Sequence, residues 1–506
     1  MILKGGEKEK SPLAVFVFQG LIIAIICIRM VVMMLGRWME CDIWFILSLG
    51  RYIVQNGIPH TNPFFIGREI GTIVPQWLYD VLMYKIQNHF GYGALLIIPY
   101  SCVVIGSLFL YKIAQKYHVD KYMSILLIAS YWYINVGTFT LRPNIFSAML
   151  CIVQIYLLEE YSQCSSIKWL VPVPLISVLE INMHCAIWPM HLCILAAYIA
   201  PQIRIPLCVK KHSYKIKPLV YVFFITLLAG LVNPYGIDAM LFLHGAITPD
   251  TVVLIKEMQP ATLNYGETMG MLVCAGVIIH AITYKYISYQ HFYLFLGWLF
   301  LGTQYSRNYI WAFLGILIVT FTLLRDTDFT KRYRIITPQN WLGFWPFIPF
   351  LVISLLSRPR VISPDENNIN TPKDVVEYIQ TYTPERNRIL NEFDNGGYFE
   401  WNGFKTYLDT RADAFLPKYT GGYDFFHEYL QMAYYADLNQ IHEIVENYDF
   451  DYAYVSDSTK LYLYFVNSSD YEYILSVREK YDTEGYPVPL DEAEKGVLFR
   501  RIKFSD

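Results

Sequence analysis

Long apolar runs recur along the first 357 residues of the chain. Most are long enough to cross the hydrocarbon core of a bilayer, which is about 30 Å thick. The pattern predicts about eleven transmembrane helices, and the division between residues 168 and 201 is the least distinct. The runs cover residues 13–36, 94–115, 121–138, 143–160, 168–183, 184–201, 217–233, 268–285, 289–303, 306–324 and 340–357.

A different pattern occupies residues 37–93, which we call the first loop. The stretch DIWFILSLGRYIV is apolar but too short to cross, and IVPQWLYDVLMYKIQNHFG repeats apolar residues at helical spacing. Between them, NGIPHTNPFFIG is rich in glycine, proline and asparagine, which indicates a turn. We expect two helices lying on the membrane surface, which together form a platform over a cavity.

From residue 358 onward, strand-like and helix-like segments alternate. NRILNEF and FDYAYVSD predict strands, KTYLDTRADAF predicts a strand that runs into a loop, and LNQIHEIVENY predicts a helix. LYLYFVNSSDYEYILSVREKY and GVLFRRIKF predict a further helix and closing strands. The sequence therefore predicts an α-helical transmembrane domain, residues 1–357 with the external loop 37–93, and a small extracytoplasmic α/β domain, residues 358–506.

Composition agrees with a polytopic membrane protein, because 55% of the residues are hydrophobic, 16% are charged and the mean hydropathy is +0.31. The net charge of −3 hides an asymmetry, since the part after residue 357 has about twice as many acids as bases. Placing the N-terminus in the cytoplasm puts the basic loops around Lys4, Lys112, Lys210 and Arg325 inside. An odd number of spans then places the C-terminal domain outside the cell membrane.

Motif searches exclude several classes of function. The nine cysteines all precede residue 358 and show no metal-binding spacing, and no H-x-H or H-E-x-x-H pair occurs. No cofactor is predicted, although a carboxylate-bound divalent cation stays open. No Walker loop or dinucleotide fingerprint is present, which argues against nucleotide hydrolysis and nucleic-acid binding. A C-terminal domain without cysteines suits a bacterial cell surface better than a eukaryotic secretory lumen.

The layout resembles the GT-C superfamily of membrane glycosyltransferases: a first span, a long external loop with an acid just past it, many further spans and an extracytoplasmic tail. In its motifs the chain is similar to a group of uncharacterised bacterial multi-pass proteins. The matching residues are Asp42, Trp44, Gly50, Arg51, Gly57, Ile58, Pro59, Pro63, Phe64, Gln76 and Trp77, with LRPNIFS, EINMH, LVNPYG and GGYFEWNGFKTYLDTRADAF further on. Some relatives have an acid in place of Asn62 or Gln76 and a histidine in place of Ile46, which leaves Asp42 and Glu40 as the nearby acids here.

The resemblance implies transfer of a sugar from a polyprenyl-phosphate-linked donor. In such a transfer a base takes the proton of the acceptor hydroxyl, the hydroxyl attacks the anomeric carbon, and the lipid phosphate leaves. A carboxylate near the bilayer interface is partly desolvated, which raises its basicity. We therefore expect Asp42 to be the base, with Glu40 beside it. The alternative is that both acids only mark the water boundary of the first helix.

A departing phosphate requires a cation, and the planar fork of arginine suits phosphate oxygens. By the predicted topology, the outer cations are Arg51, Arg142, Lys256 and Arg307. Arg142 and Arg307 each lie at a helix end in apolar surroundings, where the alternative role is an interfacial anchor. Two outer arginines oppose the prevailing charge bias, so we expect them to contact the phosphate.

The remaining substrate-binding candidates come from the first-loop motif, from polar residues near helix ends and outer segments, and from a charged cluster in the C-terminal domain. The structural alternatives are a polar clamp between helices, a solvated loop and an arginine–carboxylate network. The candidates are Gln76, Trp77, His184, Glu257, Asp409 and Arg411.

The sequence therefore predicts a GT-C-like membrane glycosyltransferase that moves a sugar from a polyprenyl-phosphate donor to a glycan, lipid or protein acceptor of the cell envelope. The alternative is a non-enzymatic membrane protein of envelope polymer assembly or export, with the tail as a docking module. The two differ in one feature: an enzyme requires Asp42 and an outer arginine to converge on a cavity. A transporter is the third possibility, but no paired, broken helices are visible in the pattern.

Overall fold

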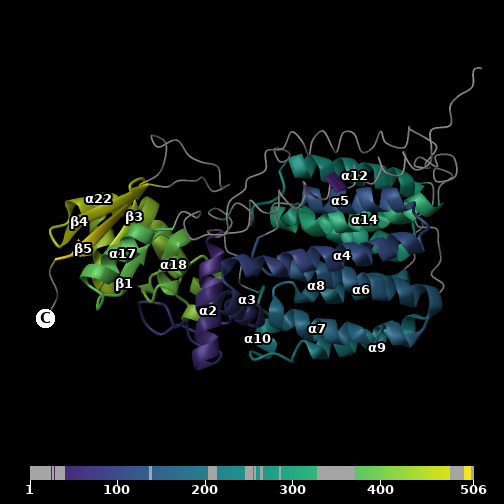
Figure 1. Ribbon diagram of the computed structural model, residues 1–506, viewed down its shortest axis with the longest axis horizontal. Helices are drawn as coiled ribbons and strands as arrows, with labels where there is room; N and C mark the ends of the chain where they lie inside the picture. The colour runs from purple at the N-terminus through teal and green to yellow at the C-terminus, as the bar shows by residue number, and fades with distance from the viewer. Residues whose placement is uncertain are drawn as a thin grey trace, which may run out of the picture.

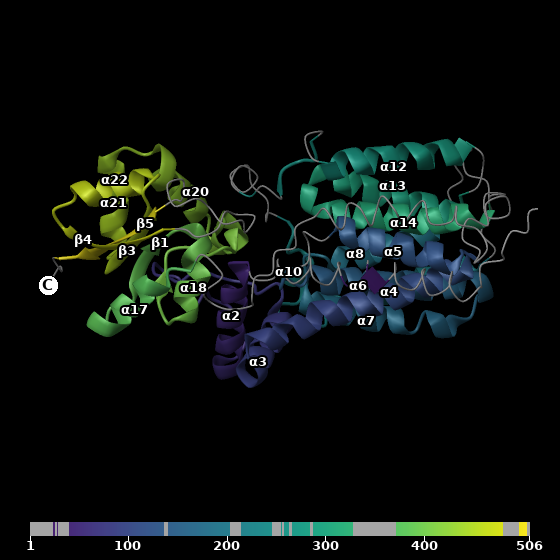
Figure 2. The ribbon, with the colours of Figure 1, turned by 45° about the horizontal axis from the view of Figure 1, so that its top comes forward.

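A helical bundle and an α/β domain lie at opposite ends of the molecule, with helix α2 (Asp42–Asn56) running between them (Figure 1). α2 crosses the direction of the bundle helices, and this arrangement is also visible after rotation (Figure 2). The computed structural model describes residues 24–25, 28, 40–135, 140–202, 214–244, 255, 258–262, 266–283, 287–326, 371–478 and 495–502.

The bundle helices run side by side along the long axis of the molecule (Figure 1). Their apolar composition leaves large side chains such as Leu175, Leu228 and Phe300 exposed on the outside, while Trp132 and Trp298 are buried between helices. Such outward apolar faces fit a lipid environment. The helices are α4 (Ile97–Lys116), α5 (Lys121–Ile134), α6 (Asn144–Cys164), α7 (Pro172–Met183), α8 (Trp188–Ile199), α9 (Ile216–Ala229), α12 (Gly266–Thr283), α13 (Tyr289–Gln304) and α14 (Tyr309–Asp326).

Each apolar run predicted between residues 94 and 324 coincides with one of these helices. Three described stretches are long and apolar enough to cross a membrane: Tyr92–Lys116, Asn144–Cys164 and Ser306–Leu324. The predicted runs 13–36 and 340–357 fall almost wholly outside the described residues. The number of eleven spans therefore stays a prediction.

The two helices predicted in the first loop are present as α2 and α3 (Trp77–Phe90). They pack against each other so closely that a Cβ at Gly50 would lie 2.1 Å from the backbone oxygen of Asp80. α2 is buried over its first turns rather than lying exposed on a surface, because its apolar residues contact the C-terminal domain as well as α3. The apolar character of α2 thus reflects contacts with protein on two sides.

The C-terminal domain is built around a five-stranded sheet in the order β2-β1-β3-β5-β4. β1 pairs parallel with β2 on one side and with β3 on the other, and β5 pairs antiparallel with both β3 and β4. The predicted alternation of strands and helices after residue 371 is confirmed. The elements are α17 (Lys373–Tyr382), β1 (Arg388–Asn391), α18 (Gly396–Trp401), β2 (Lys405–Thr406), α20 (Phe425–Leu430), α21 (Leu438–Tyr448), β3 (Tyr452–Ser456), α22 (Lys460–Asn467), β4 (Tyr471–Arg478) and β5 (Lys495–Arg501).

The turn of the first loop extends this sheet at its β2 edge. Phe65 forms a parallel bridge with Thr406, whose backbone donates to Phe64 O at 2.9 Å and accepts from Ile66 N at 3.0 Å. Phe65, Ile66 and Ile70 then enter the apolar core of the C-terminal domain. The first loop and the C-terminal domain therefore share one core, although they lie at opposite ends of the sequence.

Two glycines allow α18 to approach its neighbours. A Cβ at Gly397 would lie 2.7 Å from the backbone nitrogen of Phe45 in α2, and a Cβ at Gly396 would lie 2.0 Å from Leu408 O. Arg51 of α2 reinforces the contact, because its Nη2 donates to Trp401 O at 2.6 Å and its guanidinium lies 4.3 Å from the centre of the Trp401 ring. The glycine pair in the predicted tail motif therefore permits docking on α2.

We predict that Gly397→Ala destabilises the protein by about 1–3 kcal/mol, because the new methyl group would push apart two backbones. The apparent Tm in detergent would fall by several degrees. Gly297→Ala, in α13, is the matched control, since no atom lies within 4 Å of its Cβ position. Equal melting temperatures for the two variants would contradict this reading of the α18–α2 contact.

Candidate functional site

A cavity of about 710 Å³ lies where the bundle, the first loop and the C-terminal domain meet. Each part contributes polar side chains, so the cavity belongs to no single domain. Its polar lining includes Asp42 and Gln76 from the first loop, Arg142, His184 and Arg307 from the ends of bundle helices, and Glu392, Asp394, Arg411, Asp413, Tyr434 and Ser456 from the C-terminal domain.

Arg142 binds both acids of the predicted catalytic pair. Its Nε lies 2.7 Å from Asp42 Oδ2 and 2.9 Å from Glu40 Oε2. Asp42 is the first residue of α2 and is buried, whereas Glu40 is more open. The N-terminal end of a helix favours a negative charge, and Arg142 adds an opposite charge from just before α6. The geometry therefore makes Asp42 part of an ion-paired cluster with its cation already in place.

Gln76 and Trp77, at the start of α3, connect the first loop to its surroundings. Gln76 lines the cavity and donates to Asp80 Oδ1 at 2.9 Å. Burial raises the pKa of the Asp80 carboxyl well above its ordinary value, which the hydrogen bond from Gln76 partly opposes. Trp77 donates through Nε1 to Asn182 Oδ1 at 2.9 Å, which ties α3 to the end of α7. Trp77 thus acts on the position of α3 rather than at the cavity wall.

His184 and Arg307 bring the bundle to the cavity from two helix ends. His184 directly follows α7, and its Nδ1 lies 2.9 Å from Ser147 Oγ, which also contacts Glu180. Glu180 of α7 and His184 are therefore linked through Ser147 on α6. Arg307 lies in the short helix Ser306–Asn308 before α14, and within the described part of the chain its side chain has no hydrogen bond or ion pair.

The C-terminal domain faces the cavity with the carboxyl ends of its parallel strands. Residues 392–395 follow β1, residues 410–413 follow β2, and Ser456 ends β3. Because parallel strands all end at one edge of a sheet, their following loops converge there. The edge at which α/β sheets commonly bind ligands is therefore turned toward the bundle.

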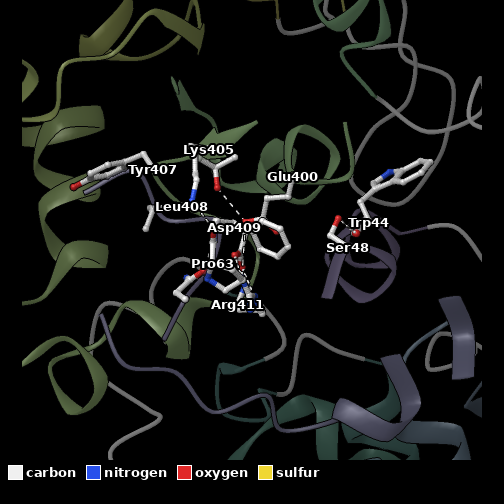
Figure 3. A network of polar contacts seen from close by, with 12 residues as sticks. Trp44, Ser48, Pro63, Glu400, Lys405, Tyr407, Leu408, Asp409 and Arg411 are labelled. Atoms are coloured by element: carbon white, nitrogen blue, oxygen red, sulfur yellow. Dashed lines mark hydrogen bonds and ion pairs between the residues drawn. The ribbon is translucent and has the colours of Figure 1, made fainter. Parts of the chain in front are cut away.

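Arg411 is held rigidly at this edge. Its backbone nitrogen and its Nε donate to Asp409 Oδ1 at 2.7 Å and 2.9 Å, its Nη2 pairs with Asp409 Oδ2, and Glu400 lies 3.8 Å away (Figure 3). Burial alone lowers the pKa of the guanidinium, but the Asp409 carboxylate more than compensates and raises it above its ordinary value. Asp409 and Glu400 are buried beneath Arg411, so only the arginine of this cluster reaches the cavity.

Three further carboxylates, Glu392, Asp394 and Asp413, line the cavity beside the predicted site residues. Asp394 is exposed toward the cavity. Partial desolvation by the protein around it raises the pKa of its carboxyl, and the negative charge of the nearby Asp42 raises this pKa further. Burial raises the pKa of Asp413 to about 6, against an opposing effect of Arg411. The sequence offered a signal for Asp413 in the alternating charges D-T-R-A-D, whereas Asp394 is recognisable only once β1 is known to end three residues earlier.

The cavity therefore brings together six of the predicted residues from segments far apart in the sequence. Among the described residues, no group of three His, Cys, Asp or Glu side chains is arranged to hold a metal ion. The residues that line the cavity are Asp42, Gln76, Arg142, His184, Arg307 and Arg411. Those behind or away from it are Glu40, Arg51, Trp77 and Asp409, and Lys256 and Glu257 lie outside the described residues.

No protein-family model matches the chain, and no curated protein matches it in sequence. Solved structures do match. The oligosaccharyltransferase of Archaeoglobus fulgidus, tethered to an acceptor peptide with the NVT sequon, has a TM-score of 0.52 at 12% identity over 88% of this chain and 69% of its own. The chain resembles an oligosaccharyltransferase in fold. The same enzyme, AglB, in complex with an inhibitory peptide and a dolichol-phosphate gives the same TM-score of 0.52 over 88% of this chain and 69% of its own at 12% identity.

This likeness agrees with the predicted fold class, a helical part followed by a C-terminal domain. At such low identity it concerns the fold alone. The similarity to particular motifs of bacterial multi-pass proteins stays a prediction.

We predict that Arg411→Ala destabilises the protein by about 3–5 kcal/mol, because Asp409 and Glu400 would then be buried without a cation. Chemical unfolding in detergent measures the change. Arg500→Ala is the control, since its pair with Glu472 is solvent-facing and worth at most about 1 kcal/mol. Similar losses for both variants would argue against a buried network at the cavity wall.

Proposed function

We propose that this protein is a GT-C-like membrane glycosyltransferase that transfers a sugar from a polyprenyl-phosphate-linked donor to an extracytoplasmic acceptor. One observation carries the proposal. Asp42 and the arginines predicted for an enzyme, Arg142 and Arg307, line one cavity, although they belong to separate segments of the chain. A scaffold for polymer assembly has no need of this convergence.

The likeness to AglB supports the donor class. That enzyme has been solved with a dolichol-phosphate, which is a polyprenyl phosphate, and with peptides. We infer that the cavity of this chain takes the phosphate and sugar of such a lipid, with the polyprenyl tail lying along the apolar faces of the bundle. By the positive-inside assignment, the C-terminal domain and the cavity lie on the outer side of the membrane.

The charges divide the cavity into distinct regions. Arg142 is engaged by Asp42 and Glu40, and Arg411 by Asp409, whereas Arg307 has no partner among the described residues. An open guanidinium near apolar helix ends suits the single negative charge of a phosphodiester. We therefore assign Arg307 to the donor phosphate. The Asp42–Arg142 pair belongs to the other region of the cavity, at the N-terminal end of α2.

We predict that Asp42→Asn abolishes transfer. The variant removes the negative charge at the head of α2 and breaks the ion pair with Arg142, whether or not Asp42 also takes the proton. The measurement is transfer of radiolabelled sugars from a panel of polyprenyl-phosphate donors to cell-envelope extract, by purified protein in detergent. Asp374→Asn, an exposed residue at the start of α17, is the control. Full transfer by Asp42→Asn would remove this residue from the site.

We predict that Arg307→Ala raises KM for the lipid donor by about 10-fold or more, because one charge-assisted contact contributes about 1.5–3 kcal/mol. Arg307→Lys would restore part of the affinity, since the ammonium keeps the charge but loses the planar fork. Arg68→Ala, an exposed arginine of the first loop outside the cavity, serves as control. Unchanged donor kinetics in Arg307→Ala would assign this arginine to an anchoring role.

A further inference from the structure

Asp413 is one of three carboxylates of the C-terminal domain that line the cavity. It lies in the short helix Ala412–Phe415 that follows Arg411, is half-buried, and lines the cavity. No other residue in the described part of the chain makes a hydrogen bond or ion pair with its side chain. Apart from the hydrogen bond that its own backbone N–H donates, its carboxylate oxygens are available to a ligand.

The position of Asp413 is fixed by its neighbours along the chain. Arg411, two residues earlier, is tied to Asp409 through backbone and side chain, and Asp409 is completely buried. Phe415, two residues later, is packed in the core of the domain. A carboxylate held between two such anchors has little freedom to move, which is the arrangement expected of a group that must meet a reacting atom.

The groups that surround Asp413 come from four segments. Arg411 and Asp409 lie on its own segment, Arg307 approaches from the bundle, and Cys185 lies just after α7. Lys418 and Tyr419 follow along the domain. Of the three cations, Arg411 is paired with Asp409, and Arg307 is the proposed ligand of the donor phosphate. Lys418 donates to Leu241 O at 2.9 Å and to Phe242 O at 3.2 Å. Asp413 therefore lies near the proposed donor site, and none of these cations forms an ion pair with its carboxylate.

The other carboxylates of the cavity are less suited to accept a proton. Asp42 is ion-paired with Arg142, and a proton taken up by Asp42 would break that pair. Glu392 accepts hydrogen bonds from Tyr429 and from the backbone of Ser456, at 2.6 Å each. Asp394 is acted on by the charges of Asp42 and Arg142, so it lies on the Asp42 side of the cavity.

We propose that Asp413 is the general base of the transfer, so that the C-terminal domain supplies a catalytic residue to a site whose donor half lies in the bundle. The inference rests on the proposed function. In the step, the acceptor O–H proton passes to a carboxylate oxygen of Asp413. The acceptor oxygen forms the bond to the anomeric carbon, and the bond between that carbon and the phosphate oxygen breaks. Its electron pair leaves with the lipid phosphate, whose charge Arg307 stabilises.

The protonation behaviour of Asp413 agrees with this role. A general base works best when its pKa lies near the operating pH, and that of Asp413 is raised to about 6 by burial. Because the base must be deprotonated, activity is low below this pKa, rises through it, and is constant above it. Arg411 stays charged over this range, because the Asp409 carboxylate outweighs the effect of burial and holds the pKa of the guanidinium above its ordinary value.

The test compares kcat/KM over about pH 5 to 8 for wild type, Asp413→Asn, Asp413→Glu, Asp394→Asn and Asp374→Asn. Wild type and the Asp374→Asn control should show an acidic limb with an apparent pKa near 6. Asp413→Asn should lose about 10²–10⁴-fold in kcat/KM together with this limb. Asp413→Glu should recover part of the rate and keep the limb. Binding of polyprenyl phosphate, measured as a rise in Tm, should be the same in wild type and Asp413→Asn.

Three results would overturn the inference. If Asp413→Asn keeps the rate and the limb, Asp413 is not the base, and the proposed function stands. Loss of the limb in Asp394→Asn would then assign the base to Asp394. If Asp413→Asn loses lipid binding as well as rate, its role is in binding rather than proton transfer. If wild type neither binds polyprenyl phosphate nor transfers a sugar, the proposed function fails, and the inference fails with it.

Discussion

The close approach of α18 to α2 is the contact on which the rest of the structure depends. Gly397 allows the backbones of the two helices to touch, and Phe65 and Thr406 join the same two regions through a strand bridge. Because α2 also packs on α3, which is bonded to the end of α7, this contact connects the C-terminal sheet to the bundle. Without it, the carboxyl ends of the strands would not face the helix ends, and no cavity would form between them.

The three arginines of the cavity show how the same residue type is put to different uses. Arg411 is buried, forms an ion pair with Asp409 and is part of the cavity wall. Arg142 forms ion pairs with Asp42 and Glu40 at the N-terminal end of α2. Arg307 keeps its charge open to the cavity. Coulomb interactions are strong where water is scarce. Because Arg411 and Arg142 are each paired with carboxylates, they add little net charge to the cavity, and Arg307 contributes most of its attraction for an anion.

Much of the architecture could be predicted from the sequence, because apolar runs, helical spacing and strand alternation are local patterns. The helices of the bundle and of the first loop follow from these patterns. The choice of Asp42, Arg142 and Arg307, at the predicted membrane interface, follows from them as well. The burial of α2 could not be predicted, since a helix that is apolar on most sides looks alike whether lipid or protein covers it. The pairing of Asp42 with Arg142, and the presence of Asp394 and Asp413 in the same cavity, depend on contacts between distant segments. No local pattern encodes those contacts.

The strand bridge between the first loop and β2 also sets an order of events during biosynthesis. Lys405 Nζ contacts Pro63 O across 342 positions of sequence, so the loop leaves the ribosome long before its partner. At about 5–20 residues per second, the delay lasts tens of seconds. Throughout that interval the core that Phe65, Ile66 and Ile70 occupy in the folded protein is missing. The backbone of Phe65 also lacks its bridge partner in β2. Until the last-made domain arrives, the nascent chain therefore exposes an apolar segment that the folded protein buries.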